Sequence, residues 1–132
     1  HPTELAATID AAGIAGGAVH VLFQPHRYSR CADCFHRFPA ACAGAASVAV
    51  LPVYAAGEEA IPGVGGRDLA EAIATGRDDP GSSQYAPTPG AGIAFLAARA
   101  RPGDTVLVLG AGDVGAASAA VLAALGEEAA CA

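Results

Sequence analysis

The chain has 132 residues, of which 53% are hydrophobic and only 5% aromatic, and its formal net charge is −6. A chain of this length builds one domain with a single hydrophobic core. The acidic balance argues against nucleic acid as a partner, because phosphate binding needs a broad basic surface. No apolar run reaches the roughly 20 residues of a membrane span, and the first residues lack a secretory signal pattern. We therefore expect a cytoplasmic, reducing setting without membrane contact.

Helical and β-branched apolar segments alternate along the chain. In chain order we expect a helix from about 3 to 13, a strand at 18–23, a helix from about 31 to 42, a strand at 46–53, a helix at 67–74, a weak strand near 83–85, a helix at 90–100, a strand at 105–110 and a helix at 113–125. This alternation predicts an α/β fold, a doubly wound, mostly parallel sheet with helices on both faces. We expect residues 1–132 to form a single domain of this kind.

Three residues bear on where the expected helices begin and end. Thr3 is a candidate N-cap for the first helix. Pro89 is well suited to the start of the helix at 90–100, because its missing N–H is not needed there. Pro39 lies inside the helical stretch at 31–42, which it should kink or cut short.

Ligands of parallel α/β sheets bind at the carboxyl ends of the strands. In this chain that rule selects three loops, Gln24–Arg30, Tyr54–Gly66 and Gly110–Gly115. We therefore look for functional residues mainly in these loops.

The sequence GAGDVG, residues 110–115, matches the G-x-G-x-x-G pattern and lies between an expected strand and an expected helix. That context is typical of dinucleotide binding, in which phosphate rests on N–H groups at the helix start. The pattern also needs a further strand with an acidic residue about 20 positions on, and no strand pattern follows Gly115. Asp113 would also place a carboxylate where the pyrophosphate approaches. A tight strand-to-helix turn is the preferred interpretation, and a Rossmann-like nucleotide-binding module is the alternative.

Cys31-Ala-Asp-Cys34 has the spacing of half a zinc site or of a dithiol redox pair. A structural zinc site normally needs four ligands, and on a helix Cys34 and His36 would point about 200° apart. A helix N-terminus beside two arginines would lower a thiol pKa, which favours the redox hypothesis. The surroundings are not those of a thioredoxin, however. We prefer cysteines packed as small hydrophobic residues, and we assign no metal ligand to the chain.

The loop PHRYSR, residues 25–30, places His26, Arg27 and Arg30 after an expected strand. Arg27 and Arg30 are three residues apart, so their guanidinium groups can converge in a first helical turn. Two forked donors suit a carboxylate or a phosphate, and His26 adds a donor that is switchable near neutral pH. The alternative is a solvated basic turn. In an acidic chain we favour an anion-binding site.

Four segments occur in an order and at distances that resemble one family. They are HPTE at residues 1–4, FQPHRYSR at 23–30, VYAAGE with IPGV within 53–64, and GAGDVG at 110–115. Together they resemble the C-terminal domain of the Mur ligases that join L-alanine to UDP-N-acetylmuramate in peptidoglycan biosynthesis. FQPHRYSR is the specific part of this resemblance, which covers essentially the whole chain.

The resemblance implies a three-domain, ATP-dependent ligase. In that family the first domain binds the UDP-sugar, the central domain carries the ATP P-loop, and the third domain brings the amino acid. ATP, assisted by Mg²⁺, phosphorylates the muramoyl carboxylate, and the amine of L-alanine attacks the acyl phosphate. This chain contains no G-x-x-x-x-G-K-[ST] sequence. The resemblance therefore implies that ATP and Mg²⁺ are bound mainly by the central domain, and that this chain alone is inactive.

The resemblance also implies roles for particular residues. His26, Arg27 and Arg30 would lie at the L-alanine site, where the arginines hold its carboxylate. His1 would lie near the nucleotide, and the turn that contains Gly112 and Asp113 would border the amino-acid pocket. No residue of this chain is expected to be catalytic. Cys31 and Ala32 stand where the family usually has Thr-Arg.

Overall fold

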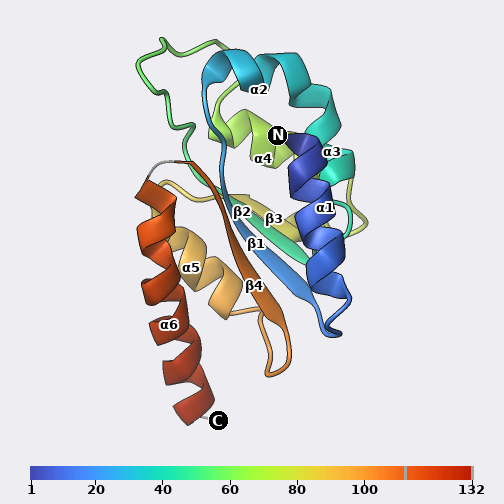
Figure 1. The fold of residues 1–132 in the computed structure, drawn as a ribbon, viewed down its shortest axis with the longest axis vertical. Helices are drawn as coiled ribbons and strands as arrows, with labels where there is room; N and C mark the ends of the chain where they lie inside the picture. Colours follow the sequence, from blue (N-terminus) through green and yellow to red (C-terminus); the bar gives the residue numbers. More distant parts are fainter. Residues whose placement is uncertain (112, 132) are drawn as a thin grey trace.

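The computed structural model describes the backbone of residues 1–111 and 113–131 (Figure 1). Helices and strands alternate, as expected for an α/β fold. In chain order they are α1 (Pro2–Gly13), β1 (Val19–Gln24), α2 (Tyr28–Cys34), the 3-10 helix η1 (Phe35–Arg37), α3 (Phe38–Ala41), β2 (Ser47–Val50), α4 (Gly66–Thr75), η2 (Pro80–Ser82), β3 (Ser83–Tyr85), α5 (Pro89–Ala97), β4 (Thr105–Gly110), η3 (Asp113–Ala116) and α6 (Ala117–Cys131). Within this part of the chain, no helix is both long and apolar enough to cross a membrane.

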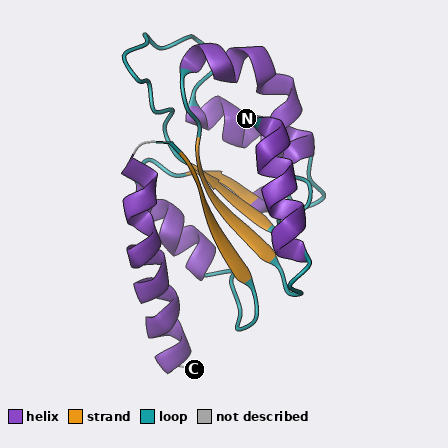
Figure 2. Ribbon diagram, in the orientation of Figure 1, coloured by secondary structure: helices purple, strands orange, loops and turns teal. Residues whose placement is uncertain are grey.

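The four strands form one parallel sheet in the order β3-β2-β1-β4 (Figure 2). Strand β1 lies between β2 and β4, and its residues are almost all buried because helices cover both faces of the sheet. Successive side chains of β1 therefore enter different cores. Val21 and Phe23 pack into one core, whereas Leu22 packs into the other.

Helices α1, α3 and α4 cover one face of the sheet, and α5 and α6 cover the other (Figure 1). On the first face Leu5 and Ile9 of α1 are buried against Val21 and Phe23 of β1. On the second face Leu22 meets residues of α5 and α6, including Leu96. The doubly wound arrangement predicted from the alternating pattern is confirmed.

The N-cap of α1 is His1, so the expectation that Thr3 caps this helix is wrong. His1 Nδ1 accepts a hydrogen bond from the backbone N–H of Thr3 at 3.3 Å, and the backbone nitrogen of His1 lies 3.4 Å from Glu4 Oε2. This is a capping box in which a histidine takes the place of the usual serine or threonine. Pro2 occupies the first helical position, where proline is favoured, and so the helix begins before Thr3.

The expected helix at 31–42 is divided, and Pro39 is not the cause. Helix α2 starts three residues earlier, at Tyr28, and the break comes at η1. Pro39 lies in the first turn of α3, where its missing N–H costs no hydrogen bond. Pro39 therefore helps to start a short helix, whereas we expected it to end a long one.

Two further boundaries differ from expectation. Strand β2 ends at Val50, three residues before the end of the expected strand. The shorter strand is consistent with Pro52, which has no N–H to donate to a sheet. At the chain's end, residues 113–116 form η3, and α6 begins only at Ala117 and continues to Cys131.

Gly110 ends β4 in a conformation and a position that exclude other residues. Its φ is 146°, and a Cβ built on it would lie 2.5 Å from the backbone oxygen of Gln24. We expect Gly110→Ala to lower the free energy of unfolding by at least about 2 kcal/mol, because the strands would have to separate locally. Urea unfolding measures this.

The matched control is Gly126→Ala in α6, where a Cβ would meet nothing within 4 Å. An alanine there should leave stability unchanged or raise it by up to about 1 kcal/mol, because alanine favours helices. Equal effects of the two substitutions would contradict the close contact at Gly110.

The carboxylate of Asp104 connects the segments that precede β1 and β4, at the amino ends of these strands. Its oxygens accept hydrogen bonds from the N–H groups of Ala18 and Arg101, both at 2.8 Å, and His20 Nε2 lies 3.2 Å away. His20 Nδ1 in turn lies 2.7 Å from Ser47 Oγ. The backbone donors, with His20, lower the pKa of Asp104 below its ordinary value.

This lowered pKa gives the stability a defined pH dependence. Because the folded pKa lies below the unfolded one, the stabilisation is present above the ordinary aspartate pKa and is lost as the pH falls through the folded value. We expect Asp104→Asn to lower the melting temperature at pH 7 and to flatten its decline in acid. Thermal unfolding from pH 7 to pH 2 measures both effects. Asp33→Asn, at an exposed position of α2, is the control, and matching profiles for both variants would refute the prediction.

Candidate functional site

A cavity of about 280 Å³ lies at the carboxyl edge of the sheet, where β1 and β4 end beside the starts of α1 and α2. Its polar lining comes from two parts of the chain, α1 with its cap and the segment from the end of β1 into α2. The polar lining residues are His1, Glu4, Thr8, Gln24, His26 and Arg30. The large apolar lining residues are Leu5, Phe23, Phe38 and Leu109. The cavity therefore joins an apolar wall to a set of ionisable and hydrogen-bonding groups.

Backbone pairing beyond β1 holds the loop that carries His26. His26 forms an isolated parallel bridge with Tyr54, and the two rings stack with their centroids 5.7 Å apart. The N–H of Arg27 donates to the Tyr54 oxygen at 2.9 Å, and the N–H of Tyr54 donates to the Pro25 oxygen at 2.8 Å. Two of the three loops selected from the sequence are thus joined by hydrogen bonds.

Of the two arginines that we expected to converge, Arg30 of α2 lines the cavity together with His26 and His1, and Arg27 does not. Both arginines are exposed. Arg27 has a φ of 63°, an uncommon value for a residue with a side chain, and it stands before the first helical residue. The spacing rule for one helical face therefore does not apply to this pair.

Glu58 fastens the loop after β2 to the start of α2, and sequence reasoning overlooked it. Its carboxylate accepts hydrogen bonds from the N–H of Ser29 at 2.9 Å and from the Ser29 hydroxyl at 2.7 Å. These bonds, with a smaller contribution from the charge of Arg27, hold the pKa of Glu58 below its ordinary value. The only signal in the sequence was the place of Glu58 within VYAAGE, one of the segments that carry the family resemblance.

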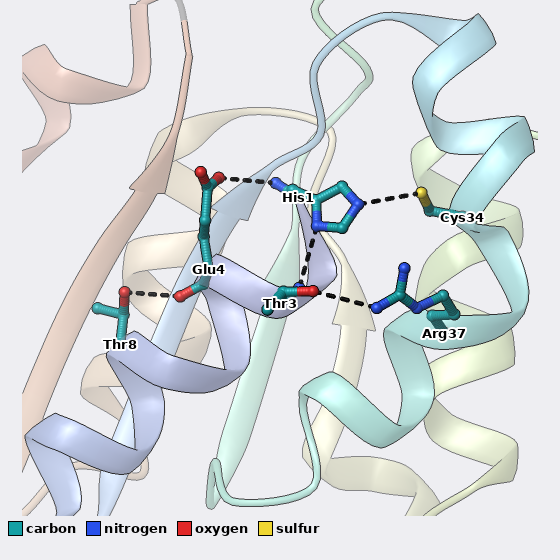
Figure 3. A network of polar contacts seen from close by, with 6 residues as sticks. All are labelled: His1, Thr3, Glu4, Thr8, Cys34 and Arg37. Atoms are coloured by element: carbon teal, nitrogen blue, oxygen red, sulfur yellow. Dashed lines mark hydrogen bonds and ion pairs between the residues drawn. The ribbon is translucent and has the colours of Figure 1, made fainter.

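His1 is held at the cavity by contacts on both ring nitrogens (Figure 3). Nδ1 accepts from the N–H of Thr3, so a neutral ring carries its proton on Nε2. Nε2 lies 3.6 Å from the sulfur of Cys34. Arg37 donates to the hydroxyl of Thr3 at 3.1 Å, which extends the network to the helix that follows α2. The ring of His1 is thus fixed by the helix cap and by Cys34 together.

The cysteines of CADC pack as small hydrophobic residues, as we preferred from the sequence. Cys31 is 2% exposed and Cys34 is 9% exposed. Burial raises the pKa of the Cys31 thiol to about 11, so the expected lowering of a thiol pKa is wrong for this residue. The desolvation of the thiolate outweighs the favourable charge of Arg30 nearby. Among the residues whose side chains are described, no group of three or more His, Cys, Asp and Glu residues could hold a metal ion.

The glycine-rich turn reaches the same cavity through its first two residues. Gly110 and Ala111 line the cavity, and Gly110 allows β4 to pack closely against Gln24. This contact accounts for the first glycine of the pattern without a nucleotide. Gly112 lies outside the described residues, as does the side chain of Asp113. The roles implied for these two residues therefore stay predictions.

Comparison with known proteins places the chain in a family. Residues 1–112 match the family model described as "Mur ligase, glutamate ligase domain". The UDP-N-acetylmuramate–L-alanine ligase of Acidobacterium capsulatum is 46% identical over 115 residues, which cover 86% of this chain and 24% of that protein. The ligase of the same name from Acidothermus cellulolyticus is 48% identical over 115 residues, covering 85% and 23%. The chain thus spans about a quarter of the length of these relatives.

A solved structure supports the fold independently. A domain described as part of a UDP-N-acetylmuramate:L-alanyl-gamma-D-glutamyl-diaminopimelate ligase from Haemophilus ducreyi superposes with a TM-score of 0.65 at 20% identity. The match covers 95% of this chain and 84% of that domain. With the family match over residues 1–112, the alternative of a separate nucleotide-binding module gains no support. The chain belongs to the Mur ligase family and corresponds to the C-terminal domain of these enzymes.

Proposed function

We propose that this domain binds L-alanine for an ATP-dependent ligase that joins L-alanine to UDP-N-acetylmuramate. The observation that carries the proposal is the cavity in which His26 and Arg30 lie together with His1. The relatives named UDP-N-acetylmuramate–L-alanine ligase, at 46% and 48% identity, support the same choice of substrates. The whole enzyme would act in peptidoglycan biosynthesis, in the cytoplasm.

The lining of the cavity suits a small α-amino acid. The guanidinium of Arg30 offers a planar set of donors to a carboxylate, and the ring of His26 can add another. The apolar wall contains Leu5 and Phe38, both of them buried, against which a methyl side chain can pack. A charged group at one end and an apolar wall at the other would orient the amino acid in one way.

Other domains would perform the activation step. Among the described residues no group of three or more His, Cys, Asp and Glu side chains could hold a metal ion, and the sequence contains no G-x-x-x-x-G-K-[ST] motif. We assign ATP and Mg²⁺ mainly to the central domain, and UDP-N-acetylmuramate to the N-terminal domain. This single domain, residues 1–132, would hold L-alanine so that its amine faces the activated carboxyl carbon. A new C–N bond then forms, phosphate leaves with the electrons of the broken C–O bond, and the amine loses a proton.

The positions of the two arginines predict which of them contributes more to binding the L-alanine carboxylate. Arg30 lines the cavity and would contact the carboxylate directly, whereas Arg27 is not among the lining residues. The family resemblance places both arginines at the L-alanine site. A role for Arg27 would therefore require that its side chain reaches the amino acid when the other domains close over this edge.

The test uses a chimera in which this domain replaces the C-terminal domain of the Mycolicibacterium smegmatis relative, which is 44% identical over 118 residues. We expect Arg30→Ala to raise the KM for L-alanine by about 30-fold or more, because a hydrogen-bonded charge pair would be lost. Arg27→Ala should have a smaller effect. Steady-state kinetics with L-alanine, glycine and L-serine measures these changes and the amino-acid preference.

Arg37→Ala is the matched control. Arg37 contacts Thr3 but does not line the cavity. Its substitution should change the KM for L-alanine by no more than about twofold, as expected for a surface residue. If Arg30→Ala leaves both the KM and kcat unchanged, the proposed carboxylate site is refuted.

A further inference from the structure

Gln24, the last residue of β1 and a lining residue of the cavity, carries an unsatisfied polar atom. Its side-chain oxygen Oε1 is buried and has no hydrogen-bond partner within the described part of the structure. Gln24 lines the cavity that also contains His26 and Arg30. Buried polar groups are almost always paired, so a water molecule or a ligand would satisfy this oxygen.

The backbone of Gln24 is held firmly, which limits where its amide can reach. Gln24 pairs with Gly110 in the parallel ladder, and a Cβ on Gly110 would lie 2.8 Å from the Cβ of Gln24. The β4 chain thus passes directly against the base of the side chain. A rigid base leaves only the outer torsions free, so the amide group explores a small volume at the cavity wall.

Other polar groups of the cavity already have partners or can only donate hydrogen bonds. Both ring nitrogens of His1 are in contact with Thr3 and Cys34, and the carboxylate of Glu4 faces the backbone nitrogen of His1. Arg30 can only donate hydrogen bonds. The Thr8 hydroxyl already donates to the Glu4 backbone oxygen, whereas Gln24 Oε1 has no partner in the described part of the structure.

We propose that Gln24 Oε1 accepts a hydrogen bond from the amine of the amino-acid substrate and so orients the amine's lone pair. This inference rests on the proposed function, in which Arg30 and His26 hold the carboxylate. The amine of an α-amino acid is a donor at one carbon's distance from that carboxylate. One donor group and one acceptor group in the same cavity would match the two polar ends of such a ligand.

The side-chain amide of Gln24 is neutral, which suits a substrate amine that has to act as a nucleophile. An amine attacks only in its unprotonated form, and a carboxylate in the place of Gln24 would favour the ammonium form. An amide oxygen accepts one N–H without taking a proton, and the lone pair stays free for the acyl carbon. Gln24 would thus bind and orient the amine, and it would not act as a base.

The test compares L-alanine with propanoate, which has the carboxylate and the methyl group but no amine. In the chimera described above, Gln24→Met removes the acceptor at similar side-chain length. We expect the KM for L-alanine to rise by about tenfold or more, whereas the inhibition constant of propanoate should change by no more than about twofold. Arg30→Ala should weaken both ligands, because both have the carboxylate.

A second variant gives a measurement that would not change if Gln24 had only a structural role. Gln24→Glu keeps an acceptor but adds a charge to a cavity that already contains Glu4, His26, Arg30, His1 and Cys31. The carboxylate would stabilise the ammonium form of the bound substrate. We therefore expect the rise of kcat with pH to move to higher pH, while the KM for L-alanine stays closer to that of the unmodified chimera than it does in Gln24→Met.

Gln84→Met, at an exposed glutamine of β3, is the control and should leave all these quantities unchanged. Thermal unfolding shows whether each variant is folded, and Gln24→Glu carries the test if Gln24→Met is not. If the unmodified chimera does not consume L-alanine, the proposed function itself is wrong. If it does, an unchanged KM in Gln24→Met, or a parallel weakening of propanoate, would overturn the role of Gln24 alone.

Discussion

The pairing of β1 with β4 up to Gln24 and Gly110 is the constraint on which the candidate site depends. The two strands approach so closely at this point that only glycine fits on β4. The same contact brings the glycine-rich turn against the loop that carries His26. One cavity can therefore collect residues from the N-terminal cap, from the FQPHRYSR segment and from the end of the last strand. Without that approach, these three segments would lie at the same edge but would not share a site.

The fold could be read from the sequence because its signals are short-range and repeated. Three β-branched apolar runs and one weak strand signal at 83–85 alternate with helical patterns, and parallel pairing follows from that order. The boundaries of the helices were harder to predict, since they depend on single capping residues. Thr3 has the right chemistry for an N-cap, but Pro2 moves the helix start so that His1 takes that place. The effect of Pro39 was wrongly predicted for a related reason, because a proline can begin a helix as well as end one.

The site was only partly predictable, and the arginines show why. Spacing of three residues indicates convergence only if both residues are helical. Arg27 has a positive φ, fixed by its N–H bond to the Tyr54 oxygen, a partner 27 positions away that no local pattern reveals. Gln24 was overlooked for the opposite reason. Its importance comes from a missing partner, a property that exists only once the surrounding chain is folded.

The composition of CADC follows from the same packing. Cys34 lies against the ring of His1, and Cys31 closes the cavity from the side of α2. A large or charged side chain at Cys31 would have to displace the buried residues around it, or leave a charge without water. Two small apolar thiols avoid both costs and leave the polar roles to their neighbours. A motif that first suggests metal or redox chemistry thus serves to shape the wall of a site in which His26, Arg30 and Gln24 provide the recognition.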